Sequence, residues 1–541
     1  MSIYQQFCKE RFNEGGSLTD FEIKCPENFN FGYDVVDRIA ELEPDKTALV
    51  WCNTKGDELF LSFRDMQALS NKAANVFRAH GLAKGDKVMV MLKRHYEYWF
   101  TVVALHKLGA VLIPVTHMLT REDIEYRINS AKIKGVVCSP DDDVPQKILS
   151  AKENCNSLSA LWTVQETVDG FINLSEEMQS ASELLERQAT LATEPMVMYF
   201  TSGTTGYPKG VIHDHTYPLS HIITAKYWQQ VEDGGLHFTV AETGWAKASW
   251  GKIYGQWLAG SAVMVFDFDN FEPKQLMTII NRYQVTTFCA PPTVYRYLVK
   301  KGTVDMPSLK HASTAGEALN PEVFHRFTEQ TGISLMEGFG QTESALILGN
   351  LSGSVSKPGS MGKPSPLYHV EVLKDDGTPA EAGEVGELVI VPRTKKQAGI
   401  FVGYHENREL YNYVWRGGVY HTGDTAWKDK DGYFWFVGRI DDVIKTGGFR
   451  VGPFEIENVL MEHPAVMECS VIGVPDDLRG QAIKAVVVLS PGYEASSPLQ
   501  KEIREFSNKR LAEYKWIRFI EFVPNMPKTI SGKIRKMEQR E

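Results

Sequence analysis

The chain has 541 residues, of which 43% are hydrophobic and 23% charged, a composition typical of folded soluble proteins and too apolar for a disordered chain. Asp and Glu number 68 against 58 Lys and Arg, and the net charge of −10 argues against a general nucleic-acid binder, which usually has a basic excess. At about 150 residues per unit, the length predicts roughly three to four domain-sized units with cores that need no structural disulfide or metal.

Seven cysteines are scattered along the chain without a Cys-x-x-Cys pair, which is typical of a reducing compartment and argues against a zinc ribbon or a disulfide framework. The N-terminal residues mix acids with bases and lack an apolar segment, so we expect no signal or transit peptide. The most apolar stretch, 98–115, is interrupted by His106 and Lys107, whereas a membrane span needs about 18 apolar residues. These features predict a soluble, cytoplasmic protein without an integral membrane segment.

The first third of the chain alternates between helical and strand patterns. Met66, Leu69, Ala73 and Phe77 recur at helical spacing, and Gly81 follows as a stop signal. The same alternation continues as strands at 88–92, 111–113 and 135–138 and helices at 96–108 and 121–131. This rhythm predicts parallel sheet with helices on its faces and ligands at the carboxyl ends of the strands.

The last hundred residues have a different pattern. Two strands are predicted at 466–474 and 482–489, with a turn at 475–477, and Ser497-Pro498 begins a helix with a capping signal. That helix is expected to bury Leu499, Ile503 and Phe506. We therefore predict an α/β fold in which a large N-terminal domain of stacked mixed and parallel sheets with flanking helices, residues 1–440, precedes a small α+β domain, residues 441–541.

The strongest local signal is the segment 199–210, YFTSGTTGYPKG. A strand ending at Phe200 leads into glycines, whose backbone N–H groups can approach an anion closely, into hydroxyl donors, and into Lys209, which adds positive charge. This chemistry suits the phosphates of a nucleotide, although the segment is neither GxxxxGK[ST] nor GxGxxG. A flexible surface loop is the alternative, and the whole string disfavours it.

Further segments lie along the chain in a fixed order, namely TAGEA at 314–318, EGFGQTE at 337–343, YHTGD at 420–424, GRIDD at 438–442 with GGFR at 447–450, and PKTISGK at 527–533. Together with the loop at 199–210 they resemble the adenylate-forming superfamily of acyl-CoA synthetases, luciferases and peptide-synthetase adenylation domains. The resemblance covers almost the whole chain and is strongest to the medium-chain acyl-CoA synthetases. It implies that the small C-terminal domain is a mobile lid.

The resemblance implies an ATP site built from several of these segments. Glu343 and Thr201 would hold Mg²⁺ against the phosphates, since this hard cation takes oxygen ligands. Asp424 would accept hydrogen bonds from both ribose hydroxyls, and Arg439 would contact ribose or phosphate unless it forms a structural salt bridge. The full set of expected ATP or AMP contacts is Thr201, Ser202, Gly203, Thr204, Thr205, Gly206, Lys209, Gly316, Glu317, Ala318, Glu337, Gly338, Phe339, Gly340, Gln341, Thr342, Asp424, Arg439, Arg450 and Lys533.

Lys533 is the expected catalytic lysine, together with Glu343 and Thr201. Attack of a carboxylate on the α-phosphate of ATP gathers negative charge at phosphorus, and a positioned ammonium group stabilises that charge. Lys533 lies between Gly532 and Ile534 in the segment that matches the family's C-terminal lysine motif. A solvated lysine in a basic tail is the alternative for this residue.

The resemblance also implies a CoA site in the smaller domain and a hinge at Asp441. Basic side chains would contact the phosphates of CoA and an aromatic face would contact its adenine. The positions that match CoA contacts in medium-chain synthetases are Gly447, Gly448, Phe449, Arg479, Trp516 and Arg518. Lys515 is left undecided between a CoA contact and an ordinary surface lysine.

The acyl site is expected at the segment 241–251 and at two of the nucleotide motifs. Acetyl-CoA synthetases have a Trp directly before the Gln-Thr-Glu of the second nucleotide motif, and Gly340 stands there in this chain. Loss of an indole leaves room for several methylenes, each worth about 0.8 kcal/mol when buried, so we expect acids longer or bulkier than acetate. The expected pocket residues are Trp245, Lys247, Trp250, Ala315 and Gly340, with an ordinary core position as the alternative for either Trp and a surface-directed amine as the alternative for Lys247.

We therefore predict an ATP-dependent acyl-CoA synthetase that converts a small carboxylic acid, ATP and CoA, with Mg²⁺, into acyl-CoA, AMP and diphosphate. The acid is expected to be medium-chain or branched. A benzoate-type aryl-CoA ligase is the nearest alternative, and a non-catalytic nucleotide-binding regulator is a remote one, disfavoured because Glu343, Asp424, Arg439 and Lys533 are all present. No nucleic-acid partner is expected, and the oligomeric state stays open, a homodimer included.

Overall fold

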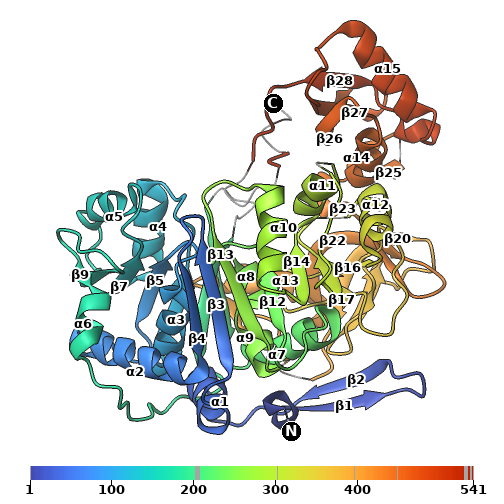
Figure 1. Cartoon of the computed structure of the whole chain (residues 1–541). Coiled ribbons are helices and arrows are strands. Elements are labelled where there is room, and N and C mark those ends of the chain that lie inside the picture. The colour runs from blue at the N-terminus through green and yellow to red at the C-terminus, as the bar shows by residue number, and fades with distance from the viewer. Residues whose placement is uncertain are drawn as a thin grey trace.

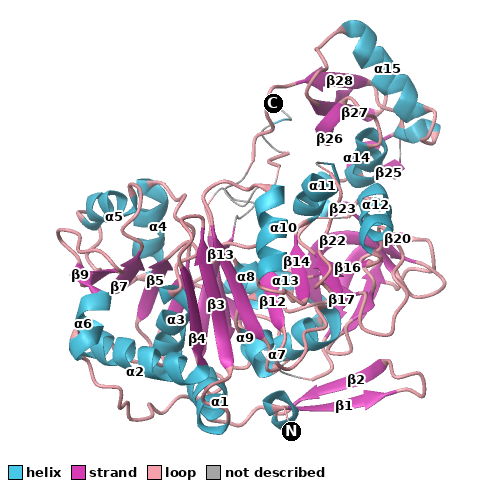
Figure 2. Cartoon of the chain, in the orientation of Figure 1, coloured by secondary structure: helices cyan, strands magenta, loops and turns pink. Residues whose placement is uncertain are grey.

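The computed structural model describes residues 2–201, 207–300, 302–317, 319–394, 397–447, 449–528, 534–536 and 539, and the backbone alone for Arg450. The N-terminal part of the chain forms two large sheets side by side, each with helices on its faces, and the C-terminal part forms a separate small unit above them (Figures 1 and 2). A hairpin of β1 (Cys8–Phe12) and β2 (Leu18–Ile23) lies along the opposite side of the molecule from the C-terminus. The predicted α/β class is confirmed.

The first large sheet carries the predicted phosphate loop. Its order is β21-β11-β10-β6-β5-β7-β8-β9, and the strands from β10 to β9 run parallel, whereas β11 and β21 pair antiparallel. Its strands are β5 (Lys87–Met91), β6 (Val111–Pro114), β7 (Gly135–Cys138), β8 (Ala160–Thr163), β9 (Ile172–Asn173), β10 (Pro195–Thr201), β11 (Lys209–Asp214) and β21 (Gly403–Tyr404).

The second large sheet carries the segments that match the adenine-side and second nucleotide motifs. Its order is β18-β17-β16-β15-β14-β12-β13-β3-β4, with a parallel centre and antiparallel strands at both edges. Its strands are β3 (Thr47–Asn53), β4 (Glu58–Ser62), β12 (Leu236–Thr239), β13 (Ala262–Asp267), β14 (Thr287–Ala290), β15 (His311–Thr314), β16 (Leu335–Phe339), β17 (Leu348–Gly349) and β18 (Lys363–Pro364).

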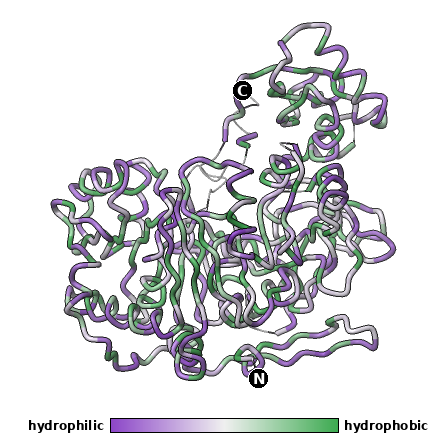
Figure 3. The backbone as a smooth tube through the Cα atoms, in the orientation of Figure 1, coloured by the Kyte–Doolittle hydropathy of each residue, from purple (hydrophilic) through white to green (hydrophobic). Residues whose placement is uncertain are grey.

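The two sheets share an apolar core that contains α3 (Glu97–Leu108), all of whose residues are buried. In β5, Val88 and Val90 face this core, whereas Met89 and Met91 face the outer side of the sheet. Successive strand residues point to opposite faces, so a strand covered on both faces must be apolar throughout. Hydrophobic segments accordingly run through the strands of the large domain (Figure 3).

The interruption of the apolar stretch by His106 and Lys107 is explained by the position of α3. The Lys107 ammonium is fully buried and donates hydrogen bonds to Asp37 Oδ1 (2.6 Å), Ser70 Oγ (2.9 Å) and Asn71 Oδ1 (2.7 Å). A buried charge is tolerated when it is paired and hydrogen-bonded in this way. Among the described residues, no helix has the length and apolarity needed to cross a membrane.

Helices cover the remaining faces of the two sheets. Those against the first sheet include α2 (Phe63–Ala79), α4 (Arg121–Ala131) and α5 (Val144–Lys152), and those against the second include α10 (Pro273–Arg282), α11 (Pro292–Lys300) and α12 (Pro321–Thr331). Capping boxes begin α2 at Ser62 and α4 at Thr120, since each cap oxygen accepts from the backbone N–H three residues later. The short helix α8 (Ala246–Gly251) lies within the acyl segment 241–251; α9 (Tyr254–Leu258) packs beside α8, and α7 (Tyr217–Ile222) packs beside α9.

An antiparallel sheet leads from the large sheets to the C-terminal domain. Its order is β19-β20-β22-β23, with β19 (His369–Leu373), β20 (Val385–Val391), β22 (Tyr420–Lys428) and β23 (Phe434–Arg439). A single turn of 3₁₀ helix, Ile440–Asp442, follows β23 and contains the predicted hinge residue Asp441.

The C-terminal domain has an apolar core of its own around Ile456, Val471 and Ile503. Its strands are β24 (Ile444–Thr446), β25 (Phe449–Val451), β26 (Val466–Asp476), β27 (Gly480–Leu489) and β28 (Phe519–Phe522), and its helices are α14 (Pro453–Met461) and α15 (Ser497–Asn508). The cap of α15 is Ser496, one residue before Ser497, since Ser496 Oγ accepts from Leu499 N–H, and Pro498 lies in the first turn, where no N–H donor is needed.

Candidate active site

The predicted phosphate loop connects β10 to β11. Thr201 is the last residue of β10 and pairs across the antiparallel ladder with Lys209, the first residue of β11. The two ends of the loop are therefore held against each other by backbone pairing. Residues 202–206, which include the predicted contacts Ser202, Gly203, Thr204, Thr205 and Gly206, lie outside the described residues.

A buried carboxylate meets the base of this loop. Glu343 Oε1 accepts hydrogen bonds from Lys209 Nζ (2.9 Å) and from the Tyr404 hydroxyl (2.8 Å). Lys209 Nζ also donates to Tyr404 Oη (3.0 Å) and lies 4.3 Å from the centre of the Tyr404 ring. Tyr404 is held in place because β21 pairs with β11. Three segments far apart in sequence thus form one hydrogen-bonded triangle, which we call the Glu343 triangle.

The Glu343 triangle keeps the carboxyl group ionised. Burial by itself favours the neutral acid, but the Lys209 charge and the two hydrogen bonds outweigh burial and lower the pKa of Glu343 below its ordinary value. The same carboxylate, together with burial, raises the pKa of the Tyr404 hydroxyl, which therefore stays a donor. The Glu343 carboxylate and the Lys209 ammonium group therefore lie side by side at the base of the phosphate loop.

The ribose motif is joined to the second nucleotide motif by Gln341. Its amide nitrogen donates to Thr422 O (2.8 Å) and to Asp424 Oδ2 (2.5 Å), and its amide oxygen accepts from the Tyr420 hydroxyl (2.8 Å). Asp424 Oδ1 accepts from Arg439 across the β22–β23 pair (3.2 Å). The predicted ribose contacts Asp424 and Arg439 are therefore brought together, in a salt bridge of the kind that was the alternative for Arg439.

The adenine-side motif follows β15 on a sharp turn. Gly316 has φ +102°, a conformation that side chains other than glycine rarely adopt. Glu317 accepts from the Thr293 hydroxyl (2.8 Å), and Ala318 lies outside the described residues. Glu337, behind this loop, accepts from Leu319 N–H (3.2 Å), and burial raises its pKa to about 8. Burial thus favours the neutral form of Glu337. Phe339, further along the same segment, is half-buried, and its ring centre lies 6.5 Å from that of Phe436.

Thr342 contributes to this site through its backbone. Its carbonyl oxygen accepts from Nε2 of the buried His213 on β11 (2.7 Å), which fixes the second nucleotide motif against the strand that begins at Lys209. The hydroxyl of Thr342 belongs to a half-buried side chain beside the Glu343 triangle.

The space expected at Gly340 is filled by the indole of Trp250. A Cβ atom added at Gly340 would lie 2.3 Å from Trp250 Cη2 and 2.8 Å from Ala345 O. A Cβ added at Gly338 would likewise lie 2.6 Å from Trp228, and the Trp228 and Trp250 rings meet edge to face at 6.2 Å. The two glycines therefore make room for two tryptophans, and Trp250 reaches from α8 to the position that a larger residue 340 would occupy.

The other predicted acyl residues lie around this tryptophan. Lys247, also on α8, donates from Nζ to the carbonyl oxygen of Ala315, and a Cβ atom added at Gly316 would lie 3.5 Å from that Nζ. Its amine is therefore directed to the adenine-side loop, and not to the surface. Trp245 is half-buried at the N-terminal cap of α8.

The predicted CoA contacts lie on one domain but do not all form one cluster. Phe449 is 51% exposed and stacks on Tyr514 at 4.5 Å. The Arg518 guanidinium lies 5.8 Å from the Trp516 ring. The remaining contacts are the ion pairs of Arg479 with Asp476 (3.6 Å) and of Lys515 with Glu455 (2.5 Å), and the hydrogen bond from Gly447 N–H to Arg479 O (3.0 Å). Gly448 and the Arg450 side chain lie outside the described residues.

Lys533 also lies outside the described residues, but the ends of its segment are described. Lys528 and Ile534, the described residues on either side of 529–533, pair across an isolated antiparallel bridge. Lys528 is anchored by an ion pair with Glu468 (2.6 Å).

Two residues of the site were missed in the sequence, namely Tyr404 and Tyr420. Tyr420 belongs to the YHTGD segment and could have been noticed there. Tyr404 lies in the segment GYHEN, which matches none of the motifs, so only the pairing of β21 with β11 reveals it.

Comparison with known proteins assigns the family. The model of the AMP-binding enzyme family matches residues 36–405, and the model of the AMP-binding enzyme C-terminal domain matches residues 455–533. The chain belongs to the AMP-binding enzyme family. The predicted membership of the adenylate-forming superfamily is confirmed.

The relatives of this AMP-binding enzyme are similar over nearly its whole length. The mitochondrial acyl-coenzyme A synthetase ACSM3 of Mus musculus is 39% identical over 550 residues, which cover 99% of this chain and 94% of the relative. The mitochondrial ACSM4 of Homo sapiens is 39% identical over 538 residues, 96% of this chain and 92% of the relative. The structure of the anthranilate CoA ligase AuaEII with anthranoyl-AMP has a TM-score of 0.86 at 27% identity and covers 95% of this chain and 97% of the ligase.

The expectation of a cytoplasmic location is wrong, since these relatives are named as mitochondrial enzymes. All seven cysteines are indeed free. Free thiols distinguish reducing from oxidising surroundings, but they do not distinguish one reducing compartment from another. The cysteine content of the chain therefore could not identify its compartment.

Proposed function

We propose that this AMP-binding enzyme is an AMP-forming acyl-CoA synthetase, an acid–thiol ligase that uses ATP and CoA. The observation that carries the proposal is the segment 337–343, from which Glu343 meets the phosphate loop and Gln341 meets the predicted ribose carboxylate Asp424. One short segment thereby connects the two ends of a nucleotide site. The names of the relatives and the anthranoyl-AMP bound by the structural neighbour support the same chemistry.

In the proposed first step, a carboxylate oxygen attacks the α-phosphorus of ATP, the bond to the bridging oxygen breaks, and acyl-AMP and diphosphate form. The loop 201–210 and Lys209 bind the β- and γ-phosphates, and Asp424 with Arg439 holds the ribose. Lys533 stabilises the charge that gathers on the α-phosphate.

Mg²⁺ is proposed to bind at Glu343 and Thr201. Within the described residues, no three His, Cys, Asp or Glu side chains form a metal cluster. The proposed ligands are therefore one carboxylate, which is kept ionised by its lowered pKa, and one hydroxyl. Mg²⁺ is commonly held by one or two carboxylates together with waters and substrate phosphates, which this donor set matches. When bound there, the ion would neutralise phosphate charge.

In the proposed second step, the CoA thiolate attacks the acyl carbon and AMP leaves. Gly447, Gly448, Phe449, Arg479, Trp516 and Arg518 are the proposed CoA contacts. We place the hinge at Asp441 and the boundary between the large domain and the lid between residues 440 and 441. The short 3₁₀ turn Ile440–Asp442, which lies between β23 of one sheet and β24 of the next, supports this position, because such element-terminal residues can absorb a change of backbone angles.

The acid is proposed to be medium-chain or branched and longer than acetate, as in fatty acid metabolism. Trp250 lies against Gly340 as a side chain on a short helix, so the indole beside Gly340 comes from α8 and not from the nucleotide motif itself. Trp245, Lys247 and Ala315 are the other proposed pocket residues. The anthranilate ligase neighbour supports an aryl acid as the second candidate.

A panel of carboxylic acids with separate assays for the two half-reactions tests the proposal. Diphosphate release reports adenylation, and thioester formation reports the transfer to CoA. We expect butyrate to octanoate and branched acids to exceed acetate, and we expect Lys533→Ala to abolish diphosphate release. Lys501→Ala, which removes an exposed lysine of α15, is the matched control. Acetate as the best acid, or near-normal adenylation by Lys533→Ala, would contradict the respective assignment.

A further inference from the structure

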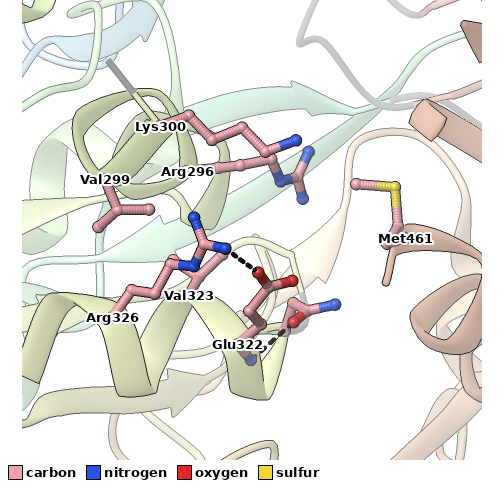
Figure 4. Close-up of a pocket in the computed structure, with 8 residues that line it drawn as sticks. Arg296, Val299, Lys300, Glu322, Val323, Arg326 and Met461 are labelled. Atoms are coloured by element: carbon pink, nitrogen blue, oxygen red, sulfur yellow. Dashed lines mark hydrogen bonds and ion pairs between the residues drawn. The ribbon is translucent and has the colours of Figure 1, made fainter. Parts of the chain in front are cut away.

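A small basic groove lies between α11, α12 and α14, and none of the residues that line it belongs to the candidate active site. It encloses about 20 Å³ and is lined by Arg296 and Lys300 of α11, by Glu322 and Arg326 of α12, by Asn320 at the cap of α12 and by Met461 of α14. Figure 4 shows the head groups of Arg296, Lys300 and Arg326 around one space, with Met461 on its other side.

The positive charges of this groove are not balanced. Glu322 pairs with Arg326 at 2.8 Å, which leaves Arg296 and Lys300, within the described part of the chain, without an ion pair. Nε of Arg296 is buried and has no hydrogen-bond partner. Burial, followed by the charge of Arg296, lowers the pKa of Lys300; the charge of Glu322 opposes this shift and that of Arg326 adds to it. Three cations thus repel one another around a single carboxylate, an arrangement that a bound anion would stabilise.

The C-terminal domain does not supply that anion. Near α14, Glu457 pairs with Lys536 (2.6 Å), Glu462 with Arg510 (3.6 Å) and Glu468 with Lys528 (2.6 Å). These acids are neutralised within their own domain. The side chain that α14 presents to the groove is the uncharged Met461.

We propose that the groove is a binding site for a phosphate group, separate from the ATP site. Arg is suited to phosphate because its planar guanidinium donates several parallel hydrogen bonds, and Lys300 adds a point charge. The Asn320 amide oxygen already accepts from Glu322 N–H (2.8 Å), so its amide nitrogen is the group left to donate. The phosphate is either a free ion or the 3′-phosphate at the end of a CoA molecule.

The charged and polar side chains of the groove all come from α11, α12 and the cap of α12, whereas Met461 is the lining side chain from the C-terminal domain. Binding therefore does not depend on the proposed function and is measured without turnover.

The binding test uses the full-length protein saturated with α,β-methylene-ATP, which fills the phosphate loop. Inorganic phosphate is titrated against chloride at constant ionic strength, and binding is followed by calorimetry and by the unfolding temperature. Relative to wild type, Arg296→Gln/Lys300→Gln is expected to weaken binding by at least about tenfold, the loss of one charge-assisted hydrogen bond. Lys274→Gln/Lys310→Gln, which removes the same charge from exposed positions outside the groove, is expected to bind as wild type does.

Glu322→Gln provides a test of opposite sign. Removal of the competing carboxylate is expected to tighten phosphate binding, and Arg296→Gln/Lys300→Gln is expected to unfold in chloride at no lower temperature than wild type, since it relieves repulsion. A second titration compares CoA with dephospho-CoA. If the double variant loses affinity for CoA but not for dephospho-CoA, the bound group is the 3′-phosphate of CoA. If the double variant and wild type bind CoA with equal affinity, the bound group is a free phosphate ion. Absence of saturable phosphate binding, or equal binding by wild type and the double variant, would overturn the proposal.

Discussion

Tyr404→Phe is the sharpest test of the Glu343 triangle. The substitution removes one hydroxyl, whose hydrogen bond to Glu343 Oε1 is 2.8 Å long, and keeps the ring that packs on Phe401 at 4.7 Å and lies under Lys209 at 4.3 Å. A hydrogen bond to a charged group is worth about 1.5–3 kcal/mol, and about 1.4 kcal/mol is a factor of ten. We therefore expect kcat/KM for ATP in diphosphate release to fall by roughly 10- to 150-fold.

The pH profile separates this cause from a general disturbance. The wild-type pKa of Glu343 is lowered, so the ionised carboxylate is lost only as pH falls through that low folded-state value. Without the Tyr404 hydroxyl the pKa rises, and the acidic limb of the ATP-dependent rate moves to higher pH. Tyr411→Phe is the control, since Tyr411 packs on the same Phe401 ring at 5.4 Å. An unchanged rate and an unchanged acidic limb in Tyr404→Phe would refute the role of the triangle.

Three further predictions concern other parts of the molecule. Gly340→Ala places a methyl group 2.3 Å from the Trp250 ring, so we expect a lower unfolding temperature, from overpacking that costs about 1–3 kcal/mol, and a changed chain-length profile of the acids used. The control Gly403→Ala, whose added methyl group meets no atom within 4 Å, is expected to change neither. An unchanged profile in Gly340→Ala would show that Trp250 does not select the acid. The folded-state pKa of Glu337 is raised to about 8, so its contribution to stability is complete below its ordinary pKa and is lost as pH rises through about 8, at up to about 1.4 kcal/mol per pH unit. Denaturant unfolding of Glu337→Gln should lack that loss, and an identical pH dependence of unfolding in both proteins would disprove the assignment. Asp441→Pro should preserve diphosphate release and abolish thioester formation, with Asp441→Ala as control, and thioester formation at the full rate would exclude the hinge.

Local patterns were sufficient for the individual elements of the fold. The predicted helix at 121–131 is α4, and the predicted strand at 135–138 is β7. Apolar runs predict doubly covered strands because both faces of such a strand need apolar neighbours, and capping residues mark helix starts because the first N–H groups need acceptors. The start of α15 shows where such local patterns stop being sufficient, because Ser496 and Ser497 are adjacent and either serine could cap the helix.

The family motifs in the sequence predicted which segments would form the nucleotide site, but the partners of their side chains were decided by the tertiary structure. Glu343 and Tyr404 are 61 residues apart, and Gln341 and Asp424 are 83 apart. Trp250 meets Gly340 only because α8 of one segment reaches the end of β16 of another. Periodicity and propensity act over neighbouring residues, whereas these contacts depend on how strands are ordered in two sheets. The chemistry of each motif is therefore local, and the charge and shape of the site that joins them are properties of the folded chain.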